Sequence, residues 1–216
     1  RSRRVVRAAE TLQRSLLSDP PQPGDLEVAV RYVPAATESQ VGGDWYDVFR
    51  QPDGATMLVI GDVVGHDTEA AASMGQLRGL LRGIAYDSAE GPAAVLARLD
   101  SAVAGLGLGS LATVLVGRLE HSEGDRADGV SRLRWASAGH LPPLLIGLDG
   151  EPQALAAPRA GLLLGVDPAA VRTEQVAVID GGSTLLLFTD GLVERRDQLF
   201  DDGVSSLGRA LVDLRH

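Results

Sequence analysis

Several short stretches of the chain either alternate apolar and polar residues, as 26–33 does, or are almost wholly apolar, as 56–60 and 184–189 are, and each is predicted to be a β-strand. The stretches are residues 26–33, 45–49, 56–60, 112–119, 131–137, 144–147, 174–179 and 184–189. Pro52, Asp53 and Gly54 separate the second stretch from the third, and this tripeptide is typical of the turn in a β-hairpin. Because most connections are short, we expect about eight strands that pair mainly antiparallel.

Two consecutive helices are predicted between the third and fourth strands. The first follows His66, and its apolar face consists of Ala70, Met74, Leu77, Leu81 and Ile84. The second begins at Pro92, a residue suited to the first turn of a helix because that position needs no N–H donor. We expect a polar loop at 121–129, a turn-rich stretch at 149–168 and a further helix at 205–214. This order of elements indicates an α+β fold in which helices cover one sheet or a pair of sheets.

Residues 1–17 carry a separate amphipathic pattern. Their apolar positions follow helical spacing on an otherwise arginine-rich segment: Val5, Ala9, Leu12 and Leu16. Prolines from Pro20 onward end this helix, so we divide the chain into a linker or regulatory helix over 1–20 and a folded domain over 21–216. The apolar stripe needs a partner, and three are open: the domain itself, the same helix of a homodimer, or an upstream helix.

Composition narrows the possible partners and compartments. The 216-residue chain has a formal net charge of −9, which argues against nucleic acid as a partner. No apolar run approaches the roughly 20 residues that a membrane span requires, so we expect no membrane segment. The chain has no cysteine, which excludes disulfides and thiolate metal sites and fits a cytoplasmic location.

Three aspartates that are distant in sequence each stand beside glycine and next to a predicted strand. They are Asp44, Asp62 and Asp190. A strand end delivers its side chains to the rim of a sheet, so we expect the three carboxylates to converge. Oxygen ligands of this kind suit Mg²⁺ or Mn²⁺. Aspartate beside glycine is also ordinary turn chemistry, so the indication comes from the repetition and not from any one position.

Four motifs of the chain together match a pattern known from one protein family. In order they are Gly42-Gly43-Asp44-Trp45-Tyr46-Asp47, Gly61-Asp62-Val63-Val64-Gly65-His66, Ala138-Gly139-His140-Leu141-Pro142-Pro143 and Phe188-Thr189-Asp190-Gly191-Leu192-Val193-Glu194. They resemble the sporulation stage II E and stress-response RsbU-like branch of the bacterial metal-dependent PP2C-type serine/threonine phosphatases. The resemblance covers nearly the whole chain, and residues 10–17 resemble the helix that joins such a domain to an upstream sensor domain. It implies a β-sandwich of mostly antiparallel sheets flanked by helices, in α-β-β-α order.

The resemblance also implies a site, a reaction and a partner. The resemblance implies that Asp62 bridges two Mn²⁺ or Mg²⁺ ions. The carbonyl of Val63 would coordinate one of these ions, and Asp190 would coordinate the other. Asp44 would lie in or next to the coordination shell. The implied reaction is hydrolysis of phosphoserine or phosphothreonine on a small partner-switching protein of the anti-anti-sigma factor type, by water activated between the two metals.

Two histidines of these motifs are not assigned chemistry. His140 is expected to shape the core or the rim of the site. Eukaryotic relatives carry a histidine two residues after the bridging aspartate, but this chain has Val64 there, so His66 is not assigned as a general acid.

One departure from the family pattern leaves an alternative open. The family usually closes with an Asp-Asp motif on a final strand, whereas this chain stops at His216, and its pair at 201–202 comes too early. We therefore expect a domain truncated at its C-terminal end or a site that lacks one ligand. The alternative function is a catalytically silent domain that binds a phosphoprotein or relays a signal. Another oxygen-ligated hydrolase, such as a nucleotidase, would share the metal ligands but not the order of motifs.

Overall fold

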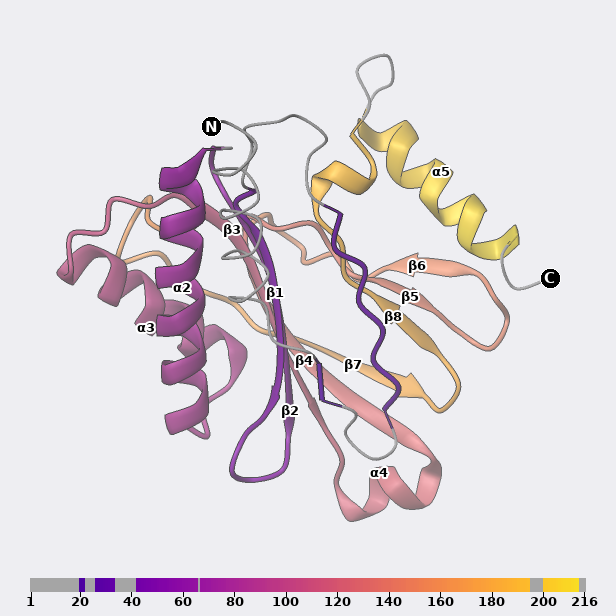
Figure 1. Ribbon diagram of the computed structural model, residues 1–216. Helices are drawn as coiled ribbons and strands as arrows, with labels where there is room; N and C mark the ends of the chain where they lie inside the picture. Colours follow the sequence, from indigo (N-terminus) through magenta and orange to yellow (C-terminus); the bar gives the residue numbers. More distant parts are fainter. Residues whose placement is uncertain (1–19, 22–25, 34–41, 66, 195–199, 214–216) are drawn as a thin grey trace.

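The computed structural model describes residues 20–21, 26–33, 42–65, 67–194 and 200–213, and these form two antiparallel sheets (Figure 1). The larger sheet contains, in spatial order, β1 (Asp44–Arg50), β2 (Thr56–Val63), β3 (Ala112–Glu120), β4 (Val130–Ala138) and β7 (Gln175–Asp180). The smaller contains β6 (Pro152–Ala154), β5 (Leu144–Ile146) and β8 (Thr184–Leu186). The turn tripeptide at 52–54 joins β1 to β2, as predicted.

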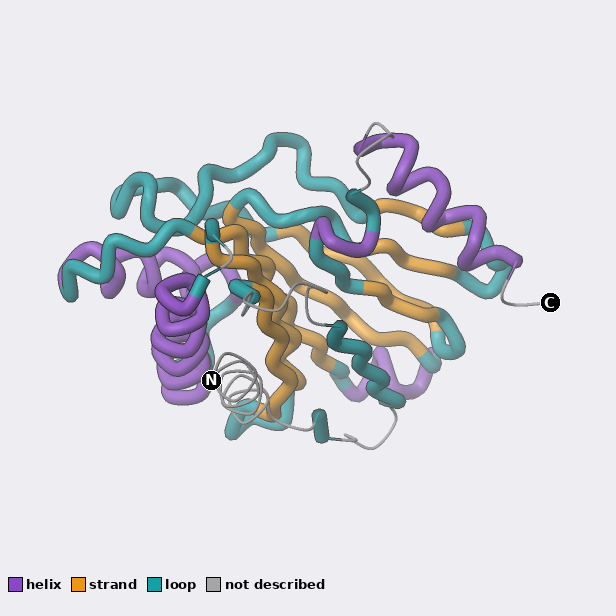
Figure 2. The backbone as a smooth tube through the Cα atoms, turned by 45° about the horizontal axis from the view of Figure 1, so that its top comes forward, coloured by secondary structure: helices purple, strands orange, loops and turns teal. Residues whose placement is uncertain are grey.

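Helices cover the outer faces of both sheets, as Figure 2 shows. Helices α2 (Thr68–Asp87) and α3 (Pro92–Gly105) pack against the larger sheet, and α5 (Phe200–Asp213) packs against the smaller one. The resulting α-β-β-α arrangement confirms the expected fold. The fully buried residues of α2 are Ala70, Met74, Leu77, Leu81 and Ala85, and the predicted Ile84 is partly buried and packs against the same core.

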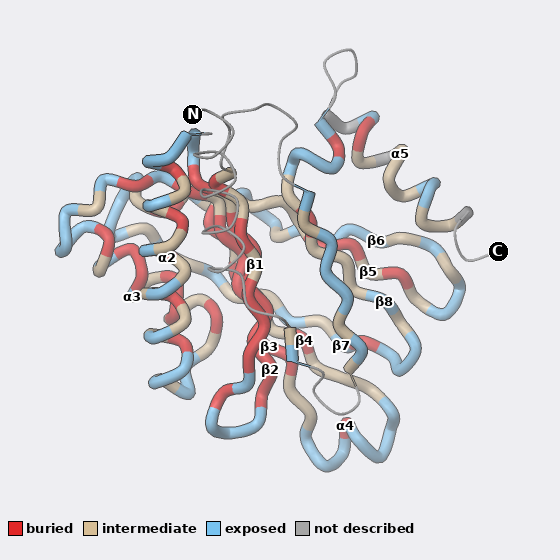
Figure 3. The backbone as a smooth tube through the Cα atoms, viewed as in Figure 1, coloured by how far each residue is buried: buried red, intermediate tan, exposed pale blue. Residues whose placement is uncertain are grey.

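Three apolar cores result from this layering, and the smallest lies between the smaller sheet and α5 (Figure 3). The core under α2 and α3 contains Trp45, Met57 and Leu99, while the core between the sheets contains Leu115 and Trp135. Alternate residues of each central strand enter one core or the other, so β2 and β3 are buried on both faces. The central strands are therefore held rigidly, and the side chains at their ends have fixed positions.

Helix α2 is tied to β1 by polar contacts as well as by apolar ones. Asp47, which is 2% exposed, pairs with Arg78 at 3.2 Å and with Arg82 at 2.7 Å. At the end of the helix, the side-chain amide of Gln51 donates to the carbonyls of Ala85 and Ser88, at 2.7 and 2.9 Å. These contacts fix the position of the helix that directly follows the Asp62 strand.

Some predicted elements were wrong in detail. Residues 26–33 form no strand, although Leu26 and Val28 pack against the core between the sheets. The predicted loop at 121–129 contains a short helix, α4 (Glu123–Asp128), and the turn-rich stretch at 149–168 contains β6. Helix α5 starts before the predicted 205–214.

The structure does not test the prediction for the N-terminal segment. The predicted helix at 1–17 and the position of His66 lie outside the described residues. Within the described residues, no helix combines the length and the apolar character required to cross a bilayer.

Candidate active site

Asp44 and Asp62 stand opposite each other at one end of the larger sheet. They are paired residues in the β1–β2 register, and their carboxyl groups are hydrogen-bonded. The next pair in the ladder is Trp45 with Gly61, and a Cβ at Gly61 would lie 2.3 Å from the Trp45 ring. Glycine is therefore required at 61 because the tryptophan ring occupies the space of a side chain. This close pairing of β1 and β2 fixes the positions of the Asp44 and Asp62 carboxyl groups at the end of the sheet.

Asp190 approaches this pair from the other sheet. It begins a short 3₁₀ helix, η1 (Asp190–Leu192), and is exposed, whereas the sequence pattern predicted a buried strand up to Thr189. The strand ends at Leu186 instead. The hydroxyl of Thr189 donates to Asp44 at 3.2 Å, so the segment is attached to the carboxylate pair. The structure thus brings all three predicted aspartates to one end of the sandwich.

The electrostatics of the three aspartates reflect their closeness. Burial, then the hydrogen bond to Asp44 and the negative charges of Asp44 and Asp190, raise the pKa of Asp62 to about 8. The pKa of Asp44 is also raised, chiefly by burial. A proton on Asp62 therefore relieves the repulsion between the acids in the metal-free protein. A divalent cation can take the place of that proton.

The carbonyl of Val63, the residue after Asp62, packs against the backbone of Gly43. The N–H of Val63 donates to the carbonyl of Gly43 at 3.2 Å. A Cβ at Gly43 would lie 2.4 Å from the Val63 oxygen. A side chain at position 43 would therefore collide with the Val63 carbonyl, so this contact requires glycine.

The donor set fits a hard divalent cation in chemistry and only partly in spacing. Three carboxylates and one carbonyl are all oxygen donors, which suits Mg²⁺ or Mn²⁺. In the described part of the chain, no three acidic, histidine or cysteine side chains are close enough to hold one ion as they stand. Asp44 and Asp62 form the close pair, so Asp190 must approach them to share an ion.

His140 lies next to the segment that carries Asp190, and both of its ring nitrogens are within hydrogen-bonding distance of protein groups. Its Nδ1 is 2.8 Å from the Thr113 hydroxyl, and its Nε2 is 3.2 Å from the Phe188 carbonyl. Burial lowers the pKa of His140 to about 4, outweighing the opposing effects of the Phe188 carbonyl and the Asp190 charge. The ring is therefore neutral near pH 7, in agreement with the expected shaping role.

Sequence reasoning missed several residues that contribute to the site. Thr113 and Thr189 were not singled out, since nothing nearby in sequence marks their partners. Asp47 belonged to the first motif but received no role. Its signal was available, because an aspartate followed by Val48 and Phe49 in a strand points to a paired, buried carboxylate.

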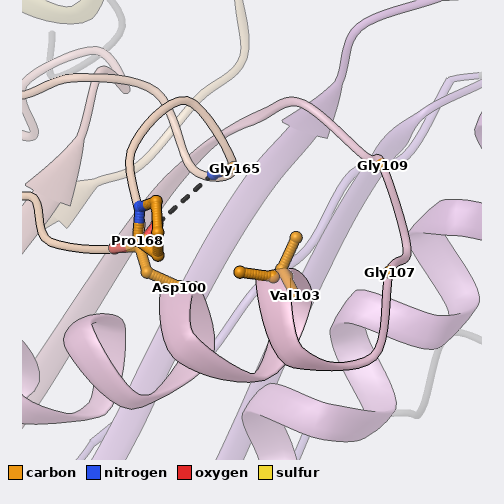
Figure 4. A pocket seen from close by; sticks show the side chains of 7 residues that line it. Asp100, Val103, Gly107, Gly109, Gly165 and Pro168 are labelled. Carbon is orange, nitrogen blue, oxygen red and sulfur yellow. Dashed lines mark hydrogen bonds between the residues drawn. The ribbon is translucent and has the colours of Figure 1, made fainter.

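A separate pocket of about 270 Å³ contains none of the three carboxylates (Figure 4). It lies between the end of α3 and the loop at 165–168. Both oxygens of Asp100 in its wall are used by Arg172, at 2.7 and 2.9 Å, and one also accepts from the N–H of Gly165 at 3.3 Å. Asp100 therefore anchors this loop and does not present a free carboxylate.

Comparisons with known proteins agree with this geometry. The sequence model of the family described as Stage II sporulation protein E (SpoIIE) matches residues 52–211. Protein IcfG of Synechocystis sp. (strain ATCC 27184 / PCC 6803 / Kazusa) is 26% identical over 183 residues, covering 72% of this chain and 27% of that protein. The crystal structure of the RsbU and RsbW domains of Rv1364c from Mycobacterium tuberculosis has a TM-score of 0.69 and 31% identity, covering 83% of this chain and 47% of that one. RsbX in complex with magnesium has a TM-score of 0.51 and 18% identity, covering 82% and 79%, which shows the fold alone.

The chain spans little more than a quarter of IcfG and about half of the Rv1364c structure. The match at 52–211 includes Asp62, His140 and Asp190, and it takes in well over half of the chain. The four motifs, the α-β-β-α sandwich and this match lead to one conclusion. The chain belongs to the SpoIIE family of PP2C-type serine phosphatase domains.

Proposed function

We propose that this domain is a metal-dependent phosphatase that hydrolyses phosphoserine or phosphothreonine on a small regulatory phosphoprotein. The family membership supports the reaction class, and RsbU-type relatives support a partner-switching protein of the anti-anti-sigma factor type as substrate. The observation that carries the proposal is the in-register pair Asp44–Asp62, with Asp190 brought beside it.

The charge of the site supports metal dependence. Three neighbouring carboxylates repel a phosphate group, which is itself negatively charged. A phosphoester would enter only after cations neutralise the cluster. The pKa of Asp62, raised by burial and then by the neighbouring acids, is consistent with a site that favours loss of its negative charge. The magnesium held by RsbX, a protein of the same fold, is consistent with this requirement.

The residues that would hold two Mn²⁺ or Mg²⁺ ions are Asp44, Asp62, Asp190 and the carbonyl of Val63. Bound ions of this kind supply Lewis-acid chemistry, since they polarise the phosphoryl group and lower the pKa of water. Asp62 is the member of this set that would be shared by both ions, since its carboxyl interacts with Asp44 and with Asp190. Thr189 would orient Asp44 through its hydroxyl, and glycine at position 43 places no side chain against the Val63 carbonyl.

Regulation forms part of the same proposal. Residues 1–20 would act as the helix that connects an upstream sensor domain to the phosphatase domain over 21–216, in a cytoplasmic protein. Because the stripe of Val5, Leu12 and Leu16 requires an apolar partner, pairing of two such helices in a homodimer is one form that this connection can take.

A calorimetric titration with Mn²⁺ tests the site. The wild-type protein should bind Mn²⁺, and the Asp62→Asn variant should lose this binding while its circular dichroism spectrum stays the same. The replacement keeps the shape of the side chain and removes the charge that both ions would share. Unchanged Mn²⁺ affinity in Asp62→Asn contradicts the assignment. Glu90→Gln, which removes an exposed carboxylate paired with Arg98 at 3.0 Å, is the matched control and should bind as the wild type does.

A further inference from the structure

We propose that His140 is a positioning residue of this site. Its imidazole ring forms hydrogen bonds to the Phe188 carbonyl and to the Thr113 hydroxyl, and we call this pair of bonds the tie. The tie holds the segment that carries Asp190 near the Asp44–Asp62 pair. The inference rests on the proposed function, because it concerns how the same metal ligands are held. It assigns His140 no contact with substrate or metal.

One end of the tie is fixed to the strand next to the carboxylates. Thr113 is the register partner of Asp62 in the β2–β3 ladder, just as Asp44 is its partner in the β1–β2 ladder. Directly opposed residues of neighbouring strands point to the same face of a sheet. Asp44, Asp62 and Thr113 therefore form a row across three strands, facing the smaller sheet.

The other end of the tie holds a segment that has left its sheet. Strand β8 ends at Leu186, two residues before Phe188, so its ladder does not fix the chain at this point. The contact of His140 Nε2 with the Phe188 carbonyl, at 3.2 Å, supplies a hydrogen bond there. The next residue, Thr189, donates to Asp44, and the one after is Asp190. Loss of the tie would leave this segment held mainly by the packing of Phe188 against Leu144 and Val193, which fixes the position of Thr189 and Asp190 less tightly.

The partners determine which ring nitrogen carries the proton. A carbonyl oxygen only accepts hydrogen bonds, so Nε2 of His140 must be the donor to Phe188. In a neutral imidazole Nδ1 is then an acceptor, and the Thr113 hydroxyl donates to it at 2.8 Å. Both nitrogens are used, which leaves His140 without a free group for proton transfer.

The backbone around His140 keeps the ring in this orientation. The N–H of His140 donates to the Ser137 hydroxyl at 2.9 Å, and that hydroxyl donates to the His140 carbonyl at 3.0 Å. Gly139 has a φ of 70°, which glycine adopts without strain, and this turns the chain sharply at the end of β4. The Ala138-Gly139-His140 turn thus places the His140 imidazole between the two sheets.

Substitutions at His140 test the proposal through metal affinity and turnover. His140→Ala should weaken Mn²⁺ binding in a calorimetric titration by about 10- to 100-fold, the usual effect of losing a residue that orients metal ligands. His140→Gln should restore much of the affinity, because its amide nitrogen can donate to Phe188 from near the position of Nε2. His140→Asn should not, because its shorter amide reaches Thr113 and not Phe188. Phosphate release from a phosphoserine peptide should follow the same order.

The chain offers a matched control at the opposite end of the same strands. His121 follows β3, and its Nε2 lies 2.7 Å from the Ser131 hydroxyl of β4. His121→Ala removes a similar histidine–hydroxyl pair, far along the strands from Asp62, and should leave Mn²⁺ affinity unchanged. A purely structural role of His140 predicts equal behaviour of the two alanine variants after correction for thermal stability.

Each outcome decides one claim. Unchanged Mn²⁺ affinity in folded His140→Ala, together with lost affinity in Asp62→Asn, overturns the positioning role and leaves the metal site intact. Equal Mn²⁺ binding by wild type and Asp62→Asn overturns the proposed function itself. If His140→Ala does not fold, Thr113→Val carries the test, since it removes the hydroxyl at nearly constant volume. Thr113→Val should weaken Mn²⁺ binding, and wild-type affinity in this variant overturns the proposal.

Discussion

Asp44 and Asp62 face each other in the β1–β2 ladder and share a hydrogen bond between their carboxyl groups. Like charges directly opposite each other in a sheet are destabilising, so this pair lowers the stability of the metal-free protein once both groups ionise. An arrangement that is unfavourable for folding and favourable for a cation is typical of a functional site. Its consequences for stability, ligand binding and activity can be measured separately.

The stability of the metal-free protein should fall as the pH rises from about 6.5 to about 8. In this window Asp62 is largely protonated in the folded state and ionised in the unfolded state. The folded protein therefore binds more protons, and raising the pH favours unfolding. The raised pKa of Asp44 acts in the same direction, while the lowered pKa of His140 opposes it only between about 4 and 6.5. Urea unfolding in EDTA at both ends of the window measures the slope.

The Asp62→Asn variant is the control for this slope, which it should greatly reduce. Saturating Mn²⁺ should reverse the slope in the wild type, because the metal competes with the proton and binds better at higher pH. A metal-free wild type whose stability rises from pH 6.5 to 8 contradicts the account of the carboxylate pair.

Gly43→Ala should damage the site through the Val63 carbonyl. The added Cβ would lie 2.4 Å from that oxygen, so the residue before β1 and the end of β2 must separate. We expect a loss of about 1–3 kcal/mol in the free energy of unfolding and weaker Mn²⁺ binding. Gly79→Ala, with no atom within 4 Å of the new Cβ, should instead stabilise α2 by roughly 0.5–1 kcal/mol. Wild-type Mn²⁺ affinity in Gly43→Ala argues against Val63 as a ligand.

Asp47→Ala should be among the most destabilising single changes in β1. It leaves Arg78 and Arg82 without their shared carboxylate, which is 2% exposed. Because Asp47 is buried but the Arg82 side chain is 40% exposed and that of Arg78 12% exposed, we expect a cost of about 1–3 kcal/mol, the range for removing one partner of a buried hydrogen bond. Glu90→Gln, in an exposed pair, should cost less than about 1 kcal/mol. Chemical denaturation compares the two variants, and similar small effects would show that Asp47 does not anchor α2.

The elements predicted correctly from sequence are those whose signals are local. The Pro52-Asp53-Gly54 turn specifies the β1–β2 hairpin, and the apolar spacing along α2 specifies its buried face. For residues 26–33, the alternating pattern agrees with the packing of Leu26 and Val28, but it wrongly predicted a strand, because strand formation depends on the whole sheet. Helix α4 was missed although Ser122 and Asp125 form a capping box that marks its start.

In the candidate site, too, the residues with a local sequence signal were predicted and the long-range contacts were not. Asp44, Asp62 and Asp190 were predicted because each stands in a glycine-containing motif. The contacts that hold them were not predictable, since they join residues far apart in sequence. His140 lies 48 residues from Phe188, and Thr189 lies 145 residues from Asp44. Side-chain hydrogen bonds over such separations depend on the completed fold and leave no periodic signal.

The regulatory role proposed for residues 1–17 predicts a specific response to a double substitution. Leu12→Glu with Leu16→Glu places two charges on the apolar stripe and should abolish its docking. In the natural full-length protein, we expect a change in oligomeric state, measured by light scattering, or in turnover. Gln13→Glu, on the polar side of the same helix, is the control. If the double variant changes neither property, the helix is a passive spacer.

The central claim is that Asp44, Asp62 and Asp190 bind divalent cations for phosphoester hydrolysis. Phosphate release from a phosphoserine peptide, with Mn²⁺ and then with excess EDTA, tests this most directly. The account predicts turnover with Mn²⁺, its loss in EDTA, its return when Mn²⁺ is restored, and a decrease of at least about 100-fold in Asp62→Asn. Undiminished turnover in excess EDTA would contradict the account, and so would a protein that binds Mn²⁺ but releases no phosphate.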